Sequence, residues 1–66
     1  MSNIEEKIHI VDGHAVFAYN RVPLRSGEEA VWYHDEVTRS SGLVSPATEE
    51  ALIAAVRAMR SKWKVV

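Results

Sequence analysis

Hydrophobic and polar side chains alternate over residues 4–11. Ile4, Ile8 and Ile10 share one parity, and polar side chains take most of the positions between them. A period of two is typical of a strand with one buried face. We therefore expect the first strand at residues 4–11.

Asp12 and Gly13 follow this strand and predict a hairpin. The type I′ turn favours this dipeptide because both central residues need positive φ. The return strand is expected at residues 14–22, which are rich in β-branched and aromatic side chains. A two-residue turn places Val11 opposite His14. The hairpin face expected to form the core consists of Ile8, Ile10, Ala15, Phe17 and Tyr19.

Residues 28–39 contain the run Ala-Val-Trp-Tyr-His-Asp-Glu-Val and permit two structures. As a strand, the run holds good β-formers but alternates poorly. As a helix over residues 27–40, it would begin with a capping box of Ser26 and Glu29 and end before Gly42. Val-Trp-Tyr is a poor helix interior, which favours the strand. In either structure the acids of the run are expected to face water.

A helix is expected over residues 46–63. Ser45 is an N-cap candidate, Pro46 suits the first helical position, and the acids at residues 49–50 complement the helix dipole. Apolar residues recur at spacings of three and four, which predicts a helix face that covers the sheet. This face consists of Leu52, Ala55, Val56, Met59 and Trp63.

These elements predict a single small α+β domain over residues 1–66, with a three-stranded antiparallel sheet and one C-terminal helix packed on it (β-β-β-α). If residues 27–40 are helical, the order becomes β-β-α-α. The first order resembles the small DNA-binding domains of some phage integrases and plant AP2-type factors. The resemblance is architectural, no residue motif accompanies it, and a fold alone does not assign a function.

Composition narrows the classes of function. The chain has 66 residues, no cysteine and a net charge of −1. The lack of cysteine excludes disulfides and thiolate chemistry, and the charge provides no positive field for nucleic acid. A chain this short buries only about 60% of its unfolded surface, which favours oligomerisation as a supplement. Because no targeting segment or membrane span is recognised, we expect a soluble cytoplasmic protein.

The reactive side chains of the run at residues 30–37 do not predict catalysis. His34, Asp35 and Glu36 are adjacent in sequence, and adjacent side chains diverge on a strand or on a helix. The chain also has no glycine-rich phosphate loop and no G-x-S-x-G turn. We therefore expect no enzymatic activity and no cofactor.

The three histidines are metal candidates only under one condition. His9 and His14 share a face in the hairpin register, and His34 joins them if its strand has the matching parity. Three imidazoles with Asp12 or Asp35 nearby would suit zinc or nickel. Because no HxH or HExxH spacing fixes their geometry, the sequence favours solvated histidines over a metal site.

The C-terminal helix offers a basic surface. Arg57, Arg60 and Lys64 lie within an arc of about 60° at 100° per residue. Such an arc could contact phosphate or an acidic partner. Cations in the last turns also complement the helix dipole and need no ligand. A nucleic-acid-binding accessory module is therefore the alternative function.

The same helix carries a seam of small residues, made up of Ala47, Ala51, Ala54 and Ala58. Small residues at heptad-like spacing let a second helix approach closely, although alanine also favours helices by itself. Trp32 is a further contact candidate, because it stands among charges if its segment is helical. We expect a small non-catalytic module that acts through protein–protein contacts, as a homodimer or with an unknown protein partner.

Overall fold

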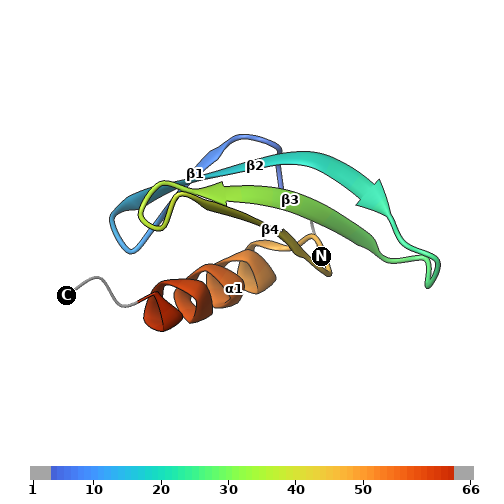
Figure 1. Ribbon diagram of the computed structural model, residues 1–66. Helices are drawn as coiled ribbons and strands as arrows, with labels where there is room; N and C mark the ends of the chain where they lie inside the picture. Colours follow the sequence, from blue (N-terminus) through green and yellow to red (C-terminus); the bar gives the residue numbers. More distant parts are fainter. Residues whose placement is uncertain (1–3, 64–66) are drawn as a thin grey trace.

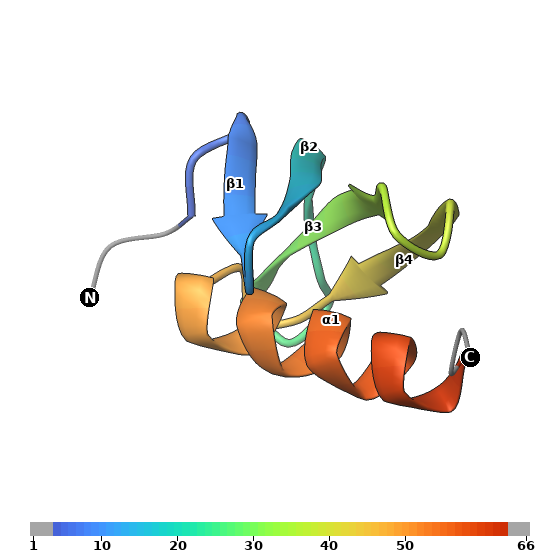
Figure 2. The same ribbon diagram turned by 90° about the vertical axis from the view of Figure 1, so that its left-hand side faces the viewer.

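In a computed structural model that describes residues 4–63, an antiparallel sheet is covered on one face by a C-terminal helix (Figure 1). The sheet has four strands in the order β1-β2-β3-β4, and the helix crosses beneath it (Figure 2). The elements are β1 Ile8–Val11, β2 His14–Pro23, β3 Glu29–Asp35, β4 Ser40–Val44 and α1 Glu49–Lys62. The predicted α+β class, with its antiparallel sheet and C-terminal helix, is confirmed.

The first hairpin has the predicted register, with Val11 opposite His14. Asp12 and Gly13 have φ values of 51° and 81°, as the type I′ turn requires. The first strand is shorter than the predicted 4–11. Ile4 lies outside it, where its backbone N–H donates to the carbonyl of Ala47 at 2.8 Å.

The hairpin turns the opposite face from the predicted one toward the core. Val16 and Ala18 are fully buried in one cluster with the helix, whereas Ile8, Ile10 and Phe17 are 61%, 68% and 48% exposed. Both faces of the hairpin are apolar, so alternation could not distinguish them. With one helix available, only one face is covered.

The predicted third element is wrong in its extent, and its helical alternative over residues 27–40 is wrong. β3 ends at Asp35, a turn follows, and β4 adds a fourth strand where three were predicted. Trp32 in β3 lies between Tyr19 of β2 and Leu43 of β4. β4 was missed because it begins Ser-Ser-Gly, a composition typical of turns.

Gly42 lies in β4 opposite Tyr33 and does not end a helix. A Cβ atom at this position would come within 2.9 Å of the Tyr33 ring. The small residue therefore lets the ring lie against β4 and reach α1. There the Tyr33 hydroxyl lies 3.8 Å from the sulfur of Met59.

α1 begins three residues later than predicted. Thr48 is its N-cap, and the hydroxyl of Thr48 accepts from the Ala51 N–H at 3.2 Å. The proposed cap, Ser45, instead donates from its hydroxyl to the Glu28 carboxylate at 3.1 Å. Pro46 therefore lies in the loop before the helix.

The inner face of α1 agrees with the predicted set in its first part. Leu52 and Val56 are fully buried, and Ala55 and Met59 pack against the core. Trp63, at the C-cap, is 58% exposed. The helix therefore covers the sheet through its first three turns and leaves its last aromatic residue in solvent.

Asp35 is fully buried between the sheet and the helix, although the acids of its run were expected to face water. Its carboxylate accepts two hydrogen bonds from Arg60, with Nε–Oδ2 and Nη2–Oδ1 distances of 3.0 and 2.6 Å. It also accepts from the Val37 N–H and the Thr38 hydroxyl, both at 3.3 Å. Arg60 Nη1 donates to the carbonyl of Val11 at 2.6 Å. One ion pair thus joins the ends of two strands, β1 and β3, and the turn before β4 to α1.

The Asp35 carboxyl is ionised in the folded chain. Burial alone raises the pKa of Asp35, but the hydrogen bonds from Arg60 and Val37, with the Arg60 charge, outweigh burial and hold this pKa below its ordinary value. The hydrogen bonds to Asp35 raise the pKa of Arg60 in turn. The pair therefore stays charged across the physiological range.

We expect Arg60→Met to unfold most of the chain. The substitution leaves the buried Asp35 carboxylate without its partner, which typically costs about 3–5 kcal/mol and is comparable to the stability of a small domain. Urea titration followed by circular dichroism, with the dispersion of amide NMR shifts, measures the loss. Asp35→Leu combined with Arg60→Met should recover part of it, because no buried charge then remains.

Arg57→Met is the matched control for this prediction. Arg57 lies one turn earlier on α1 and makes an exposed ion pair with Asp12. Exposed pairs contribute little, so this variant should keep the wild-type urea midpoint. Equal destabilisation by both substitutions would contradict the role assigned to Asp35 and Arg60.

The ion pair also predicts how stability depends on pH. Because the pKa of Asp35 is lower in the folded than in the unfolded chain, the unfolded state binds more protons between the two values. The contribution is fully present above the unfolded pKa of about 3.9 and is lost as pH falls below it. Carboxyl-carbon NMR should place the Asp35 midpoint below 3.9, with a urea midpoint that falls in acid. A midpoint at or above that value would refute the assignment.

Candidate functional site

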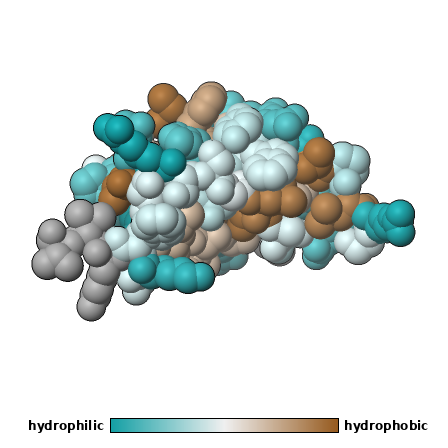
Figure 3. Space-filling view, in the orientation of Figure 1, coloured by the Kyte–Doolittle hydropathy of each residue, from teal (hydrophilic) through white to brown (hydrophobic). Residues whose placement is uncertain are grey.

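The most unusual surface of the molecule is the face of the sheet turned away from α1, here called the open face. Five large apolar side chains reach solvent on it. If each side chain has an area of about 200 Å², the five together expose roughly 500 Å² of apolar surface. The largest apolar patch of a typical monomer is about 300–600 Å², so this patch is near the upper end of that range. Figure 3 shows hydrophobic residues at the surface on the sheet side. The five are Ile8, Ile10, Phe17, Trp32 and Leu43.

Strand pairing arranges the open face in three rows that run across the strands. The first row consists of Ile10, Ala15 and Glu36. The central row consists of Ile8, Phe17, His34 and Ser41. The third row consists of Tyr19, Trp32 and Leu43. None of these positions holds a lysine or an arginine, and the polar groups in the three rows are Ser41, His34, Glu36 and the Tyr19 hydroxyl.

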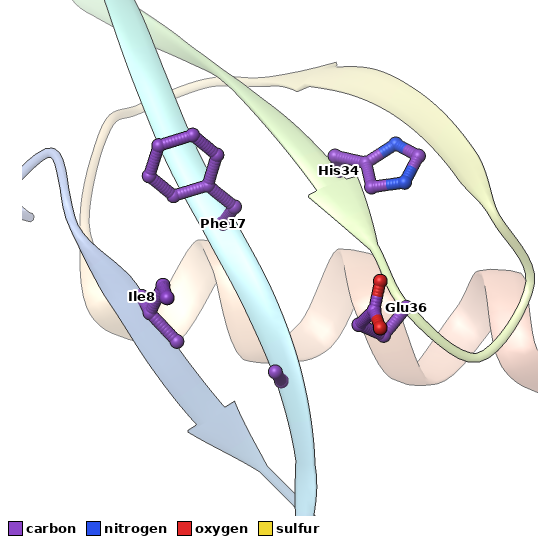
Figure 4. A pocket seen from close by; sticks show the side chains of 5 residues that line it. Ile8, Phe17, His34 and Glu36 are labelled. Atoms are coloured by element: carbon purple, nitrogen blue, oxygen red, sulfur yellow. The ribbon is translucent and has the colours of Figure 1, made fainter.

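A hollow of about 360 Å³ opens on this face over Ala15, between the first and central rows. Figure 4 shows the labelled side chains around it, with the helix behind the sheet. The rings of Phe17 and Tyr19 stack with centroids 5.7 Å apart, which holds Phe17 at one wall. The lining residues are Ile8, Ala15, Phe17, His34 and Glu36. The hollow exists because Ala15 is short where its neighbours are long.

β4 brings Ser41 beside His34, a contact that the sequence did not reveal because β4 was not predicted. His34 Nδ1 lies 3.0 Å from the Ser41 hydroxyl. A serine next to a histidine can form a nucleophile–base pair when a third group orients the imidazole. Over residues 4–63, His34 makes no second side-chain hydrogen bond, and the pair lies on an open surface. The arrangement lacks both the orienting group and the exclusion of water.

The three histidines do not converge. His34 lies on the open face, whereas His9 and His14 have the parity of Val16, on the side of the helix. His9 Nε2 is 2.8 Å from the carbonyl of Glu5. Within the described part of the chain, no group of three or more potential ligands could hold a metal ion. The metal hypothesis required His34 to point to the same face of the sheet as His9 and His14, and in the structure it points to the opposite face.

The basic arc of the helix is engaged within the fold as far as the structure describes it. Arg57 donates from Nε and Nη2 to the two carboxylate oxygens of Asp12, both at 2.9 Å. These hydrogen bonds lower the pKa of Asp12. Arg60 is bound to Asp35, and Lys64 lies outside the described residues. A phosphate at this arc would compete with two bidentate carboxylates.

The alanine seam is divided between the core and the surface. Ala47 is buried before α1 begins, and its N–H donates to the carbonyl of Glu29 at 2.8 Å. Ala51 packs against the core, while Ala54 and Ala58 are exposed. Trp32, 36% exposed, lies on the other side of the molecule, on the open face. The predicted contact residues therefore do not form one surface.

In the part of the chain that the structure covers, α1 falls short of the length and apolarity needed to cross a membrane. Comparison with family models, with curated proteins and with solved structures finds no match.

Proposed function

We propose that this chain is a non-catalytic protein-interaction module that works as a homodimer through its open face. The observation that supports the proposal is the combination of five exposed large apolar side chains and no cationic side chain in the three rows. Such a surface is suited to bury another apolar surface. It is poorly suited to remain in water.

A second copy of the chain is the occupant that these properties favour. Each copy has a net charge of −1, so two copies repel each other only weakly. Two sheets can pack face to face about 10 Å apart. Burial of the open face would give each copy a second core layer, which a chain of 66 residues otherwise lacks.

The size of the face predicts the strength of the dimer. The exposed apolar area of roughly 500 Å² is below the 800 Å² or so that each partner contributes to a standard interface. Small interfaces bind weakly unless their fit is good. We therefore expect a reversible dimer with a dissociation constant in the micromolar range.

Nucleic-acid binding is the alternative function, and the geometry favours it less. Aromatic rings on a sheet can stack on bases, but single-strand binding also needs cations along the backbone path. Arg57 and Arg60 are paired with carboxylates on the far side of the sheet. The three rows of the open face hold no lysine or arginine.

We expect Ile10→Lys to abolish the dimer without unfolding the chain. Ile10 is 68% exposed in the folded monomer, so its replacement costs the fold little, while a buried charge at a dimer interface is unfavourable. Sedimentation equilibrium from about 1 μM to 1 mM, around the expected dissociation constant, should show a dimer for the wild type and a monomer for the variant.

Ala54→Glu separates the open face from the alanine seam. Ala54 is exposed on α1, on the opposite side of the molecule. If the sheet forms the interface, this variant should sediment as a dimer like the wild type. If the helix forms it, the variant should sediment as a monomer. A wild-type monomer at every concentration would refute the homodimer. Retention on single-stranded oligonucleotide at low salt would then support the alternative.

A further inference from the structure

We propose that the hollow on the open face binds an arginine side chain of a partner protein, carried on an extended segment. This inference goes beyond the homodimer and does not depend on it. The hollow has a volume of about 360 Å³, near the lower end for ligand sites, which suits one long side chain. Its lining is apolar on β1 and β2, and polar where His34 of β3 and the following Glu36 border it.

The ring of Phe17 gives the hollow a surface for stacking. Phe17 is 48% exposed. Figure 4 looks onto the open face with α1 behind the sheet, and it shows the ring broadside, so one face of the ring is turned to solvent. The Tyr19 ring, with its centroid 5.7 Å away, restrains Phe17 in this position. A planar group can therefore lie on Phe17 without a change in the fold.

The charge of the open face favours a cationic group on this ring. Glu36 is exposed, and within residues 4–63 no hydrogen bond or ion pair engages its carboxylate. Its backbone N–H donates to the carbonyl of Ala15 at 3.2 Å, which fixes the residue at the edge of the hollow. Because the three rows hold no lysine or arginine, a second copy cannot supply a cation from its own open face. A positive partner for Glu36 has to come from a different protein.

A guanidinium matches the ring and the carboxylate at once. It is planar and always charged, stacks on aromatic faces and presents paired N–H donors to a carboxylate. Phe17 lies opposite His34, and Glu36 is two residues further along, so Phe17 and Glu36 are diagonal neighbours roughly 7–8 Å apart. A guanidinium on the ring can therefore reach the carboxylate. Where Nδ1 of His34 donates to Ser41, Nε2 is a further acceptor.

The apolar part of the open face suits the rest of such a segment. Ile8 and Ala15 offer apolar contact to the methylene groups of the arginine. In an extended segment alternate side chains share one face, so the residues two before and two after the arginine also meet the open face. Ile10, Trp32 and Leu43 are exposed there. The partner segment therefore carries apolar residues at these two positions.

The acetylated peptide amide Leu-Thr-Arg-Thr-Leu tests the site. Titrated into the isotope-labelled chain, it should shift the NMR resonances of the residues that line the hollow. We expect a dissociation constant of about 0.1–1 mM, because the contact is much smaller than a standard interface. The same peptide with citrulline, which keeps the shape of arginine without its charge, should bind about tenfold more weakly. A lysine peptide should also bind more weakly, because an ammonium is not planar.

Glu36→Gln tests the carboxylate from the side of the chain. The variant should weaken the arginine peptide about fivefold, the upper range for an exposed ion pair, and leave the citrulline peptide unchanged. Because Glu36 is exposed, circular dichroism should show an unchanged fold. Glu50→Gln is the matched control, since Glu50 is also exposed but lies in the first turn of α1. It should leave the dissociation constant of the arginine peptide unchanged.

Three outcomes would overturn the arginine site and leave the homodimer standing. The first is equal binding of the arginine and citrulline peptides. The second is an equal effect of Glu36→Gln and Glu50→Gln on the arginine peptide. The third is the absence of shifts at the hollow up to about 10 mM peptide, tenfold above the expected range.

Discussion

The buried ion pair between Asp35 and Arg60 holds the sheet and the helix in one arrangement. Asp35 accepts from the turn that leads to β4, and Arg60 also donates to the carbonyl of Val11 at the end of β1. Because Asp35 must face α1, the alternate residues of β3 are directed outward. The pair thereby decides which side of the sheet becomes the core. A buried carboxylate without its partner is strongly destabilising, so Asp35 stays against Arg60 on the helix side, and the other face of the sheet is left apolar in solvent.

Local signals in the sequence predicted the elements whose structure is local. The turn residues Asp12 and Gly13 determined the register of the first hairpin, and periodicity located the C-terminal helix. β4 has no such signal, because its turn reaches positive φ at Arg39, without glycine or asparagine. The burial of Asp35 depends on an arginine 25 residues away, and no local pattern shows that contact. The side of the hairpin that meets the helix is a long-range property for the same reason.

The sequence predicted that the chain has an apolar association surface, but it did not predict where on the fold this surface lies. A surplus of apolar residues beyond one core predicted association. Trp32 was named as a contact candidate on the premise that its segment is helical, but the segment is strand β3. The location depended on the side of the sheet, so the predicted interface fell on the alanine seam of the helix. Ser41 and the hollow over Ala15 could not be found without β4 and the strand register. The lack of catalytic activity, the homodimer and the alternative of nucleic-acid binding stay predictions for solution experiments.

Side chains of β3 alternate between the core and the open face, and this alternation constrains how the sequence of the strand can evolve. Tyr33 and Asp35 point into the fold, and Trp32 and His34, their immediate neighbours, point out of it. Substitutions at the outward positions can alter recognition while the core stays intact. An insertion or deletion of one residue within β3 would exchange the two sets, because side chains alternate with a period of two. This strand can therefore diverge in residue identity, while its length is held constant.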